Sequence, residues 1–592
     1  MECSDLVRQV TAPDGLESQP TDLARSGNTV FYLASIPEEE LLARLSEEFT
    51  LGLNAAGVAR IMTDAQDAQI KATIASCRAE TSQARKLLAL LPLATLEANL
   101  PQGLLATVRR LSDEQGPEQV AELLMHVHGY NVLTELRHPL AAAGFQVPDR
   151  WAGSPPAIAF VRRLGFATEY AGTRGGSLDA DVTVLGPPRL EPLHDYQVEL
   201  AAQIRALVRT SDDPQRALLF LPTGAGKTRV TVEALTKAFL EDGFVGPLLW
   251  IAQTEELCEQ AVQTWSTVWR EFGDQPMRIC RLWSTNEVAQ SDGSLTVVVA
   301  TDAKLDHIRD REDYDWLSSA AAVVIDEAHT ATGAGMDRTL KWLGLETRQS
   351  ARPLLGLTGT PFKGTGEEAN VRLSNLFGNR KLDVLGEDPY GTLQRLGVLA
   401  RVEHRILDGA SVRLDAGEAQ QIRTFNTLPA AVLERLGRDE ARTRRLLEDI
   451  SALPPHWPVL VFTASVLSAQ ILSALLRIRG IEAASVSGAT RTSDRRRSID
   501  AFRRGDVKVL TNCNVLTQGF DAPAVRALYI ARPTFSPNAY IQMVGRGLRG
   551  PANGGKKECL VVNVADTLDQ FGENLAYKEF DYLWNEQGGS TP

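Results

Sequence analysis

The stretch "LLFLPTGAGKTRVTVEAL", Leu218–Leu235, decides the fold of this chain. Its first four residues are apolar, as in a strand that is buried on both faces of a parallel sheet. The residues after Lys227 have the apolar spacing of a helix. The glycine-rich turn between them lets backbone N–H groups point into a concavity, and the helix N-terminus adds partial positive charge. The stretch therefore predicts a strand–loop–helix unit that binds phosphate.

The loop also predicts the ligands, ATP and Mg²⁺. We expect Lys227 to reach the β- and γ-phosphates and the Thr228 hydroxyl to ligate Mg²⁺. The remaining loop residues surround the phosphates: Thr223, Gly224, Ala225 and Gly226. Leu221 stands where the general form of this pattern has a glycine. The alternative is a glycine-rich turn with an incidental lysine, and it leaves the complete run Gly-Ala-Gly-Lys-Thr without a reason.

A second motif, "AAVVIDEAHTAT", brings two adjacent carboxylates to the end of an apolar run. Such a pair is costly at the end of a parallel strand unless a cation or catalysis requires it. We expect Asp326 to hold Mg²⁺ through water, and Glu327 to orient and deprotonate the water that attacks the γ-phosphate. The alternative, a solvated acidic turn, is disfavoured because the phosphate loop lies upstream in the same predicted sheet.

The third motif is "YIQMVGRGLRG", in which two arginines stand among three glycines. If residues 538–549 form a helix, Gln542, Arg546 and Arg549 fall at i, i+4 and i+7, on one face. One amide and two guanidiniums suit the polyphosphate of an ATP that is held by another domain. A solvated helix face is the alternative, but it does not account for the flanking glycines.

Composition limits the class of protein. The 592 residues predict several domains, and the net charge of −12 argues against a surface that binds nucleic acid all over. A local basic groove is still compatible with this charge. The six cysteines are scattered, which favours reduced thiols in the cytoplasm. We find no signal-peptide pattern and no apolar run long enough for a bilayer, so we expect a soluble, intracellular protein.

The spacing of apolar residues along the chain changes near residue 185. Residues 1–185 carry apolar side chains at helical spacing, which predicts a mainly helical N-terminal accessory region. Two series of short apolar runs separated by helical segments follow, within residues 186–395 and 396–592. They predict two α/β domains with parallel sheets and a cleft between them. Because all motifs lie beyond residue 185, we expect a fragment that lacks residues 1–185 to remain folded.

The order of the motifs, together with "GLTGTP", "VLTQGFDAP" and "QMVGRGLR", resembles the superfamily 2 helicases and translocases, the DEAD/DEAH-box group in the broad sense. The resemblance covers roughly residues 190–580. It implies two tandem RecA-like domains that bind ATP in their cleft and nucleic acid across their shared surface. It also implies that Arg546 and Arg549 form the arginine-finger motif, with Gln542 beside them.

The resemblance implies further roles, position by position. Gln197 would read the adenine edge, and Tyr196 beside it would stack or merely pack. The residues that would contact the ribose and phosphates are Gly519 and Asp521. The residues that would contact the nucleic-acid backbone are Thr254, Thr301 and Thr511. Thr358 and Thr360 would couple nucleotide state to domain closure, and His329 would serve nucleic-acid contact or this coupling. For each threonine the alternative is an ordinary strand former.

The resemblance also bears on the substrate. "LTGTP" and "QGFDAP" look more like type I restriction motor subunits, which translocate on duplex DNA, so we expect an ATP-driven translocase or helicase with DNA as its partner. An RNA helicase or remodeller and an ATP-gated clamp or scaffold are the alternatives. The stretch "RWAGSPPAIAFVRRLGFATEYAG" is similar to a segment that precedes helicase cores in bacterial proteins suspected of phage defence. We find no metal-nuclease or nucleophile constellation in residues 1–185, so we expect this region to dock a protein partner or to gate access of the substrate.

Overall fold

The structure is a computed structural model, and it describes residues 23–26, 29–32, 38–48, 52–112, 116–172, 181–184, 190–209, 215–290, 295–346, 352–359, 367–425, 427–516 and 524–568. The chain forms two compact units. One comprises residues 1–100 and 115–174, and the other comprises residues 101–114 and 175–592.

The first unit is mainly helical, as the spacing of its apolar residues predicts. A hairpin of β1 (Leu23–Ser26) and β2 (Thr29–Tyr32) precedes its helices. The helices are α1 (Glu38–Glu48), α2 (Ala55–Ala79), α3 (Gln83–Leu90), α4 (Leu93–Ala98), α6 (Pro117–His128), α7 (Val132–Glu135), α8 (Arg137–Ala142) and α9 (Pro155–Arg163), with short 3₁₀ turns η2 (Gly129–Asn131) and η3 (Thr168–Ala171). Side-chain oxygens cap two of them: Asn54 accepts from the Gly57 N–H, and Ser154 accepts from the Ala157 N–H.

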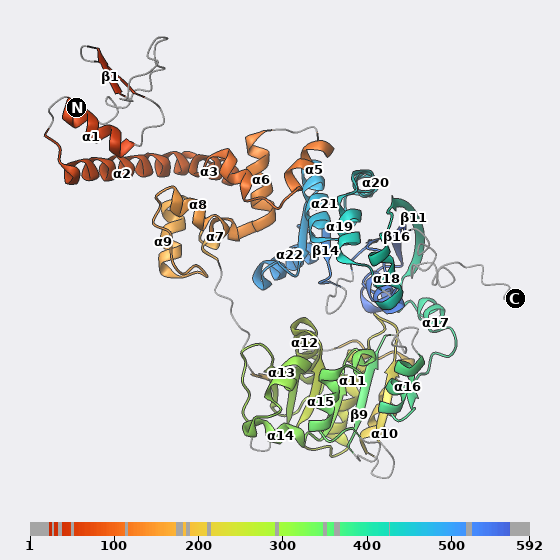
Figure 1. The fold of residues 1–592 in the computed structure, drawn as a ribbon. Coiled ribbons are helices and arrows are strands. Elements are labelled where there is room, and N and C mark those ends of the chain that lie inside the picture. Colours follow the sequence, from red (N-terminus) through yellow and green to blue (C-terminus); the bar gives the residue numbers. More distant parts are fainter. Residues whose placement is uncertain are drawn as a thin grey trace. The chain divides into compact units, whose positions relative to one another are not determined.

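The second unit contains two α/β lobes (Figure 1). In the first lobe an eight-stranded sheet has the order β10-β4-β9-β8-β5-β7-β6-β3. All its neighbours are parallel except β3 and β6, which are antiparallel. The strands are β3 (Asp181–Val184), β4 (Arg216–Phe220), β5 (Leu248–Ala252), β6 (Met277–Leu282), β7 (Thr296–Thr301), β8 (Ala322–Ile325), β9 (Leu354–Thr358) and β10 (Lys381–Leu382).

Helices flank this sheet, and all except the last, which follows β10, come between its strands in the sequence (Figure 1). They are α10 (Asp195–Arg209), α11 (Lys227–Glu241), α12 (Glu255–Phe272), α13 (Asp302–Ile308), α14 (Asp315–Ser318), α15 (Ala334–Trp342), α16 (Glu367–Leu376) and α17 (Pro389–Arg395), with the 3₁₀ turns η4 (Glu312–Tyr314) and η5 (Ala328–Thr330). The five apolar runs of the first predicted series are the strands β4, β5, β7, β8 and β9, all buried.

The second lobe has a six-stranded, wholly parallel sheet of order β11-β16-β15-β12-β14-β13. Its strands are β11 (Arg401–Ser411), β12 (Val459–Thr463), β13 (Ala483–Ser487), β14 (Val509–Cys513), β15 (Ala527–Ala531) and β16 (Glu558–Thr567). Its helices are α18 (Ala416–Phe425), α19 (Ala430–Arg438), α20 (Glu440–Ser451), α21 (Val466–Ile478), α22 (Thr492–Arg504) and α23 (Pro537–Gly545), followed by η6 (Pro551–Asn553). The prediction of two successive parallel sheets is confirmed.

Strand register brings the motifs to one edge of the first sheet. β9 pairs in parallel with both β4 and β8, with Phe220 opposite Thr358 and Ile325 opposite Gly356. The carboxyl ends of these three strands therefore meet, and ligands of open α/β sheets bind at such an edge. The phosphate loop after β4, the two carboxylates after β8 and Thr358 at the end of β9 come together in this way.

The structure differs from the expected division of the chain in two places. β3, at residues 181–184, already belongs to the sheet of the first lobe. Residues 101–114, which include α5 (Leu104–Leu111), belong to the compact unit of the lobes, and α5 packs against α20 and α21. Among the described residues, no helix combines the length and the apolar character that a membrane span requires.

Candidate nucleotide-binding site

The phosphate loop has the conformation that its glycines permit. β4 ends at Phe220, α11 begins at Lys227, and both Gly224 (φ +89°) and Gly226 (φ +88°) have left-handed backbones. Residues with a β-carbon rarely adopt this conformation. Leu221, which replaces the glycine of the general pattern, is fully buried, and its N–H donates to the Thr358 carbonyl. Leu221 therefore packs in the hydrophobic core just after the end of β4.

Two side chains at the start of α10 donate hydrogen bonds to the backbone of the phosphate loop. The Tyr196 hydroxyl donates to the Ala225 carbonyl at 2.8 Å, and Gln197 Nε2 donates to the same oxygen at 3.1 Å. A β-carbon on Gly226 would lie only 2.6 Å from Gln197 Nε2. Of the two roles left open for Tyr196, packing is the one that this buried position favours. Gln197 fixes the phosphate loop and does not line the pocket described next.

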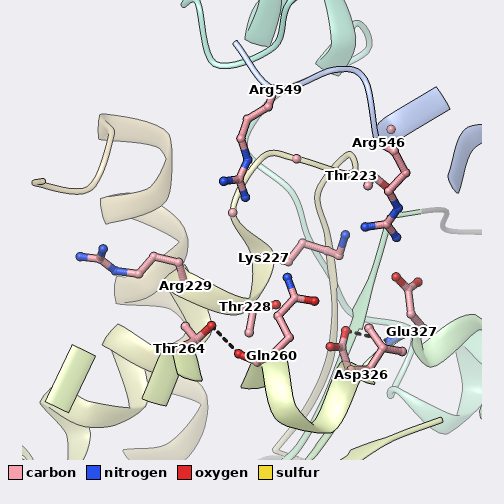
Figure 2. A pocket seen from close by; sticks show the side chains of 14 residues that line it. Thr223, Lys227, Thr228, Arg229, Gln260, Thr264, Asp326, Glu327, Arg546 and Arg549 are labelled. Carbon is pink, nitrogen blue, oxygen red and sulfur yellow. Dashed lines mark hydrogen bonds between the residues drawn. The ribbon is translucent and has the colours of Figure 1, made fainter. Parts of the chain in front are cut away.

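A pocket joins the motifs of both lobes (Figure 2). The first lobe contributes the loop, including Lys227 and Thr228, and the carboxylates Asp326 and Glu327. The second lobe contributes Arg546 and Arg549, whose guanidiniums point into the pocket in Figure 2. The full lining is Thr223, Gly224, Gly226, Lys227, Thr228, Arg229, Leu257, Gln260, Thr264, Asp326, Glu327, Gly545, Arg546 and Arg549. The pocket thus combines several cations with one pair of carboxylates.

The carboxylate pair is buried and electrostatically strained. Burial raises the pKa of Asp326, the charge of Glu327 raises it further, and the nearby charges of Lys227 and Arg546 partly oppose both effects. The Glu327 N–H donates to Asp326 Oδ1 at 2.9 Å. Glu327 has a left-handed backbone (φ +48°), which costs free energy in a residue with a side chain and is often found at functional sites. An added cation would relieve this pair.

His329 links the carboxylates to the end of β9. Its Nδ1 lies 3.4 Å from Glu327 Oε2 and 3.3 Å from Thr358 Oγ1. All three side chains are buried. This arrangement places two of the residues predicted to couple nucleotide state to domain closure, His329 and Thr358, in direct contact with each other.

The helix that carries the arginines is shorter than predicted. α23 ends at Gly545, Arg546 is its C-cap, and Arg549 forms an isolated antiparallel bridge with Leu399. The expectation of a helix through residue 549, with Gln542, Arg546 and Arg549 on one face, is therefore wrong. The physical reason is close packing: β-carbons on Gly545 and Gly550 would clash with Thr223 and with residues 397–399. Gln542 is buried in α23 and does not line the pocket.

The donor set fits Mg²⁺ only together with the phosphates. Thr228 and Asp326 supply a hydroxyl and a carboxylate oxygen to the same pocket, and oxygen is the ligand that Mg²⁺ prefers. No cluster of three or more His, Cys, Asp or Glu suited to a metal occurs among the described residues. Mg²⁺ in nucleotide sites keeps several waters and takes phosphate oxygens, so two protein ligands are sufficient.

The threonines occupy different kinds of position. Thr254 and Thr301 are the N-caps of α12 and α13, and their hydroxyls accept from the N–H groups of Leu257 and Lys304 at 3.3 Å. Thr511 is fully buried in β14, and its hydroxyl donates to the Ala469 carbonyl at 2.9 Å. This leaves Thr511 the ordinary role of a strand threonine. The predicted residues Thr360, Gly519 and Asp521 lie outside the described residues.

Pocket residues on α11 and α12 are absent from the sequence-based prediction. Gln260 and Thr264 line the pocket beside Leu257, and Gln260 extends toward Lys227 in Figure 2. Arg229 joins them from α11. The spacing of Leu257, Gln260 and Thr264, at i, i+3 and i+7, places them on one helix face. A polar pair on that face is the signal that could have identified them.

Comparisons with known proteins place these motifs in a wider context. Residues 191–363 match the family model described as "Type III restriction enzyme, res subunit", and residues 443–550 match "Helicase conserved C-terminal domain". The irc3 protein of Schizosaccharomyces pombe, described as a mitochondrial ATP-dependent helicase, is 27% identical over 388 residues, which are 64% of this chain and 58% of that protein. IRC3 of Saccharomyces cerevisiae is 26% identical, over 60% of this chain and 49% of that protein.

A third relative is "DNA 3'-5' helicase XPB" of Mycobacterium tuberculosis, which is 26% identical over 60% of this chain and 58% of that protein. This chain thus spans about half the length of the curated relatives that it matches. Among solved structures, S. cerevisiae Dbp5 bound to RNA and ADP BeF3 matches at 16% identity with a TM-score of 0.42, over 66% of this chain and 92% of that chain. The restriction-enzyme match is to a type III subunit and does not single out the type I motors.

Proposed function

Because this chain belongs to the superfamily 2 helicases, we propose that it hydrolyses ATP in the pocket and uses the reaction to move along nucleic acid, with DNA as its preferred substrate. The observation that carries the proposal is the composition of the pocket. Lys227, Asp326 and Glu327 come from the first lobe, and Arg546 and Arg549 come from the second. Hydrolysis at such a pocket depends on both lobes at once.

Each pocket residue has a distinct task in this proposal. Lys227 and the loop N–H groups bind the β- and γ-phosphates. Glu327 accepts the proton of the attacking water, and Arg546 stabilises the charge that develops on the transferred phosphoryl group. Asp326 and Thr228 would hold Mg²⁺, which supplies charge neutralisation at the phosphates when it is bound.

The preference for DNA rests on two observations. The segments "LTGTP" and "QGFDAP" resemble those of motors that act on duplex DNA. The relatives named as DNA helicases match over 60% of this chain, whereas the RNA helicases DBP5 and dbp3 match over 18% and 44%. A motor that grips phosphates needs no base-reading side chains, so we expect weak sequence preference and strong salt dependence.

We further propose a three-part organisation for the working protein, in which the helical unit docks a protein partner and the two lobes form the motor. The motif resemblance to segments before bacterial helicase cores supports a setting in phage defence. The five cysteines in the described part of the chain are free and buried, which suits the cytoplasm.

The test compares ATP hydrolysis with duplex DNA, single-stranded DNA, RNA and no nucleic acid. We expect duplex DNA to stimulate wild type most, Lys227→Ala to be inactive, and Lys341→Ala, at an exposed position of α15, to behave as wild type. Strongest stimulation by RNA would favour the RNA helicase alternative. ATP binding without hydrolysis under every condition would favour an ATP-gated clamp.

A further inference from the structure

One side chain of the second lobe reaches the phosphate loop from outside the family motifs. Asn553, at the end of η6, donates through Nδ2 to the Gly224 carbonyl at 3.3 Å. Its Oδ1 lies 3.2 Å from Nε2 of His194, which stands just before α10 in the first lobe. A single amide therefore contacts two segments of the nucleotide site.

The chemistry of the partners fixes the orientation of this amide. A backbone carbonyl can only accept a hydrogen bond, so the NH₂ group of Asn553 must face Gly224 and its oxygen must face His194. His194 then carries a proton on Nε2 and donates it to Asn553. The amide of Asn553 can form both hydrogen bonds only in this orientation. An imidazolium, with protons on both ring nitrogens, would form the same bond from Nε2.

His194 is itself tied to the residues that hold the phosphate loop. Its ring stacks on Tyr196, with centroids 5.8 Å apart and planes inclined by 9°. Its backbone N–H donates to Gln197 Oε1 at 3.0 Å. Tyr196 and Gln197 both donate to the Ala225 carbonyl. Asn553 thus contacts the loop directly at Gly224 and indirectly through His194.

The turn that carries Asn553 is tightly constrained and begins next to Arg549. The Lys556 N–H donates to the Arg549 carbonyl at 3.1 Å, and the Gly555 N–H donates to the Gly550 carbonyl at 2.9 Å. A β-carbon on Gly555 would lie 2.1 Å from the Arg549 carbonyl oxygen. The Ala552 N–H donates to the Gly397 carbonyl at 3.0 Å, which fixes the turn to its own lobe.

We propose that Asn553 is a positioning residue that sets the register between the arginines of the second lobe and the phosphate loop of the first. Because the turn is compact, a bond from Asn553 to Gly224 also fixes where Arg549 stands relative to the bound polyphosphate. Asn553 is half-buried, and its two bonds serve the contact between lobes rather than the core of either one. This inference rests on the proposed ATPase function and adds a residue that no motif contains.

The experiment measures closure of the lobes separately from hydrolysis. A dye pair is placed at Lys341→Cys in the first lobe and Arg477→Cys in the second, both exposed, in a Cys3→Ser background of the full chain. Energy transfer between the dyes is recorded with AMP-PNP and duplex DNA. The variants are Asn553→Ala, Asn553→Asp, His194→Ala and the double variant with Asn553→Ala, with Lys557→Ala as the exposed control near the same turn.

Two neutral hydrogen bonds predict that Asn553→Ala shifts the closure equilibrium toward the open state by about tenfold or more. Stimulated kcat should fall with it, while nucleotide affinity without DNA and the melting temperature stay close to wild type. Asn553→Asp should be at least as severe, because a carboxylate oxygen would face the Gly224 carbonyl. His194→Ala should be non-additive with Asn553→Ala.

Wild-type closure and kcat in Asn553→Ala would overturn the inference while leaving the proposed function intact. Additive effects of the two substitutions would also overturn it, since the bond between these side chains would then carry no coupling. If wild type itself neither closes nor hydrolyses ATP with any nucleic acid, the proposed function fails and this inference fails with it.

Discussion

Gly545 of the second lobe lies directly against Thr223 of the phosphate loop. A β-carbon on Gly545 would lie 2.5 Å from the Thr223 Cβ, a separation that real side chains essentially never show. Gly545 also ends α23 and immediately precedes Arg546. The glycine is therefore required by the approach of the two lobes, and the first arginine of the motif enters the pocket because this approach is so close.

Gly545→Ala should separate nucleotide binding from hydrolysis. The added methyl group forces Thr223 and Arg546 apart, and a displacement of about 1 Å at a reacting centre can cost on the order of 10²-fold in rate. We expect a loss of that size in DNA-stimulated kcat, with ATP affinity without DNA nearly unchanged. Gly488→Ala is the matched control, since a β-carbon there meets nothing within 4 Å. Equal rates for both variants would contradict this packing argument.

Glu327→Gln should trap the protein in its closed state. The amide keeps the shape of the side chain and leaves Asp326 in place, but it cannot accept the proton of the attacking water. We expect simultaneous retention of ATP and DNA with hydrolysis abolished, measured as slow DNA release in the presence of ATP. Normal turnover in this variant would show that Glu327 is not the general base.

Arg546→Ala should lose stimulated turnover while retaining ATP binding. Lys227 and the loop amides stay in place, whereas the charge from the second lobe is gone, and an arginine finger contributes about 10³-fold or more in rate. Arg549→Ala should show the same pattern in milder form. Arg444→Ala, exposed on α20, is the control. A loss of ATP affinity as large as that in Lys227→Ala would assign Arg546 to ground-state binding instead.

Asp326→Asn should stabilise the nucleotide-free protein in a pH-dependent way. Burial and the charge of Glu327 raise the pKa of Asp326 above its ordinary value of 3.8, so the folded state binds more protons than the unfolded state above that pH. Wild-type stability therefore falls as pH rises from about 4 toward the raised pKa. Asparagine at position 326 carries no charge at any pH, so the variant does not lose stability in this way.

Thermal melts at about pH 4.5 and pH 8 measure the effect. The variant should melt above wild type at the higher pH, and the difference should shrink at the lower pH. Asp274→Asn, at an exposed position after α12, serves as the control. A variant that melts at or below wild type at the higher pH would contradict the assignment.

Sequence predicts the parts of this molecule that are encoded locally. The buried strands and the phosphate loop each depend on a few consecutive residues, so apolar runs and glycines were sufficient to identify them. Gly545, the last residue of α23, lies instead against Thr223, which is more than 300 residues away in the sequence. The contact of His194 with Asn553 joins residues 359 positions apart. No local pattern encodes such contacts, and they decide how the two lobes complete one pocket.

The sequence of α5 predicts a helix with one apolar face, but it does not predict which elements this face packs against. This helix lies within residues 1–185, the region predicted to be mainly helical and separate from the two α/β domains. In the structure Leu104, Thr107 and Val108 are buried, and α5 packs on α20 and α21 of the second lobe. Arg110 also forms an ion pair with Glu440, but both side chains are well exposed and such pairs contribute little. The apolar face therefore carries the attachment.

The structure accordingly revises the expected result of removing residues 1–185. This deletion removes α5 from α21 and β3 from the edge of the first sheet, so we expect an aggregating fragment with an exposed apolar helix face.

The attachment of α5 can also be tested in the full chain. Val108→Asp should destabilise the second lobe by about 2–4 kcal/mol, since it buries an unpaired charge without deleting any element. Ala106→Asp, on the exposed face of the same helix, should be nearly neutral. Denaturant unfolding of both variants, beside solubility of the fragment, measures this. A soluble fragment with wild-type ATPase activity would show that α5 is dispensable. Equal stabilities of Val108→Asp and Ala106→Asp would show that the buried face of α5 does not stabilise the second lobe.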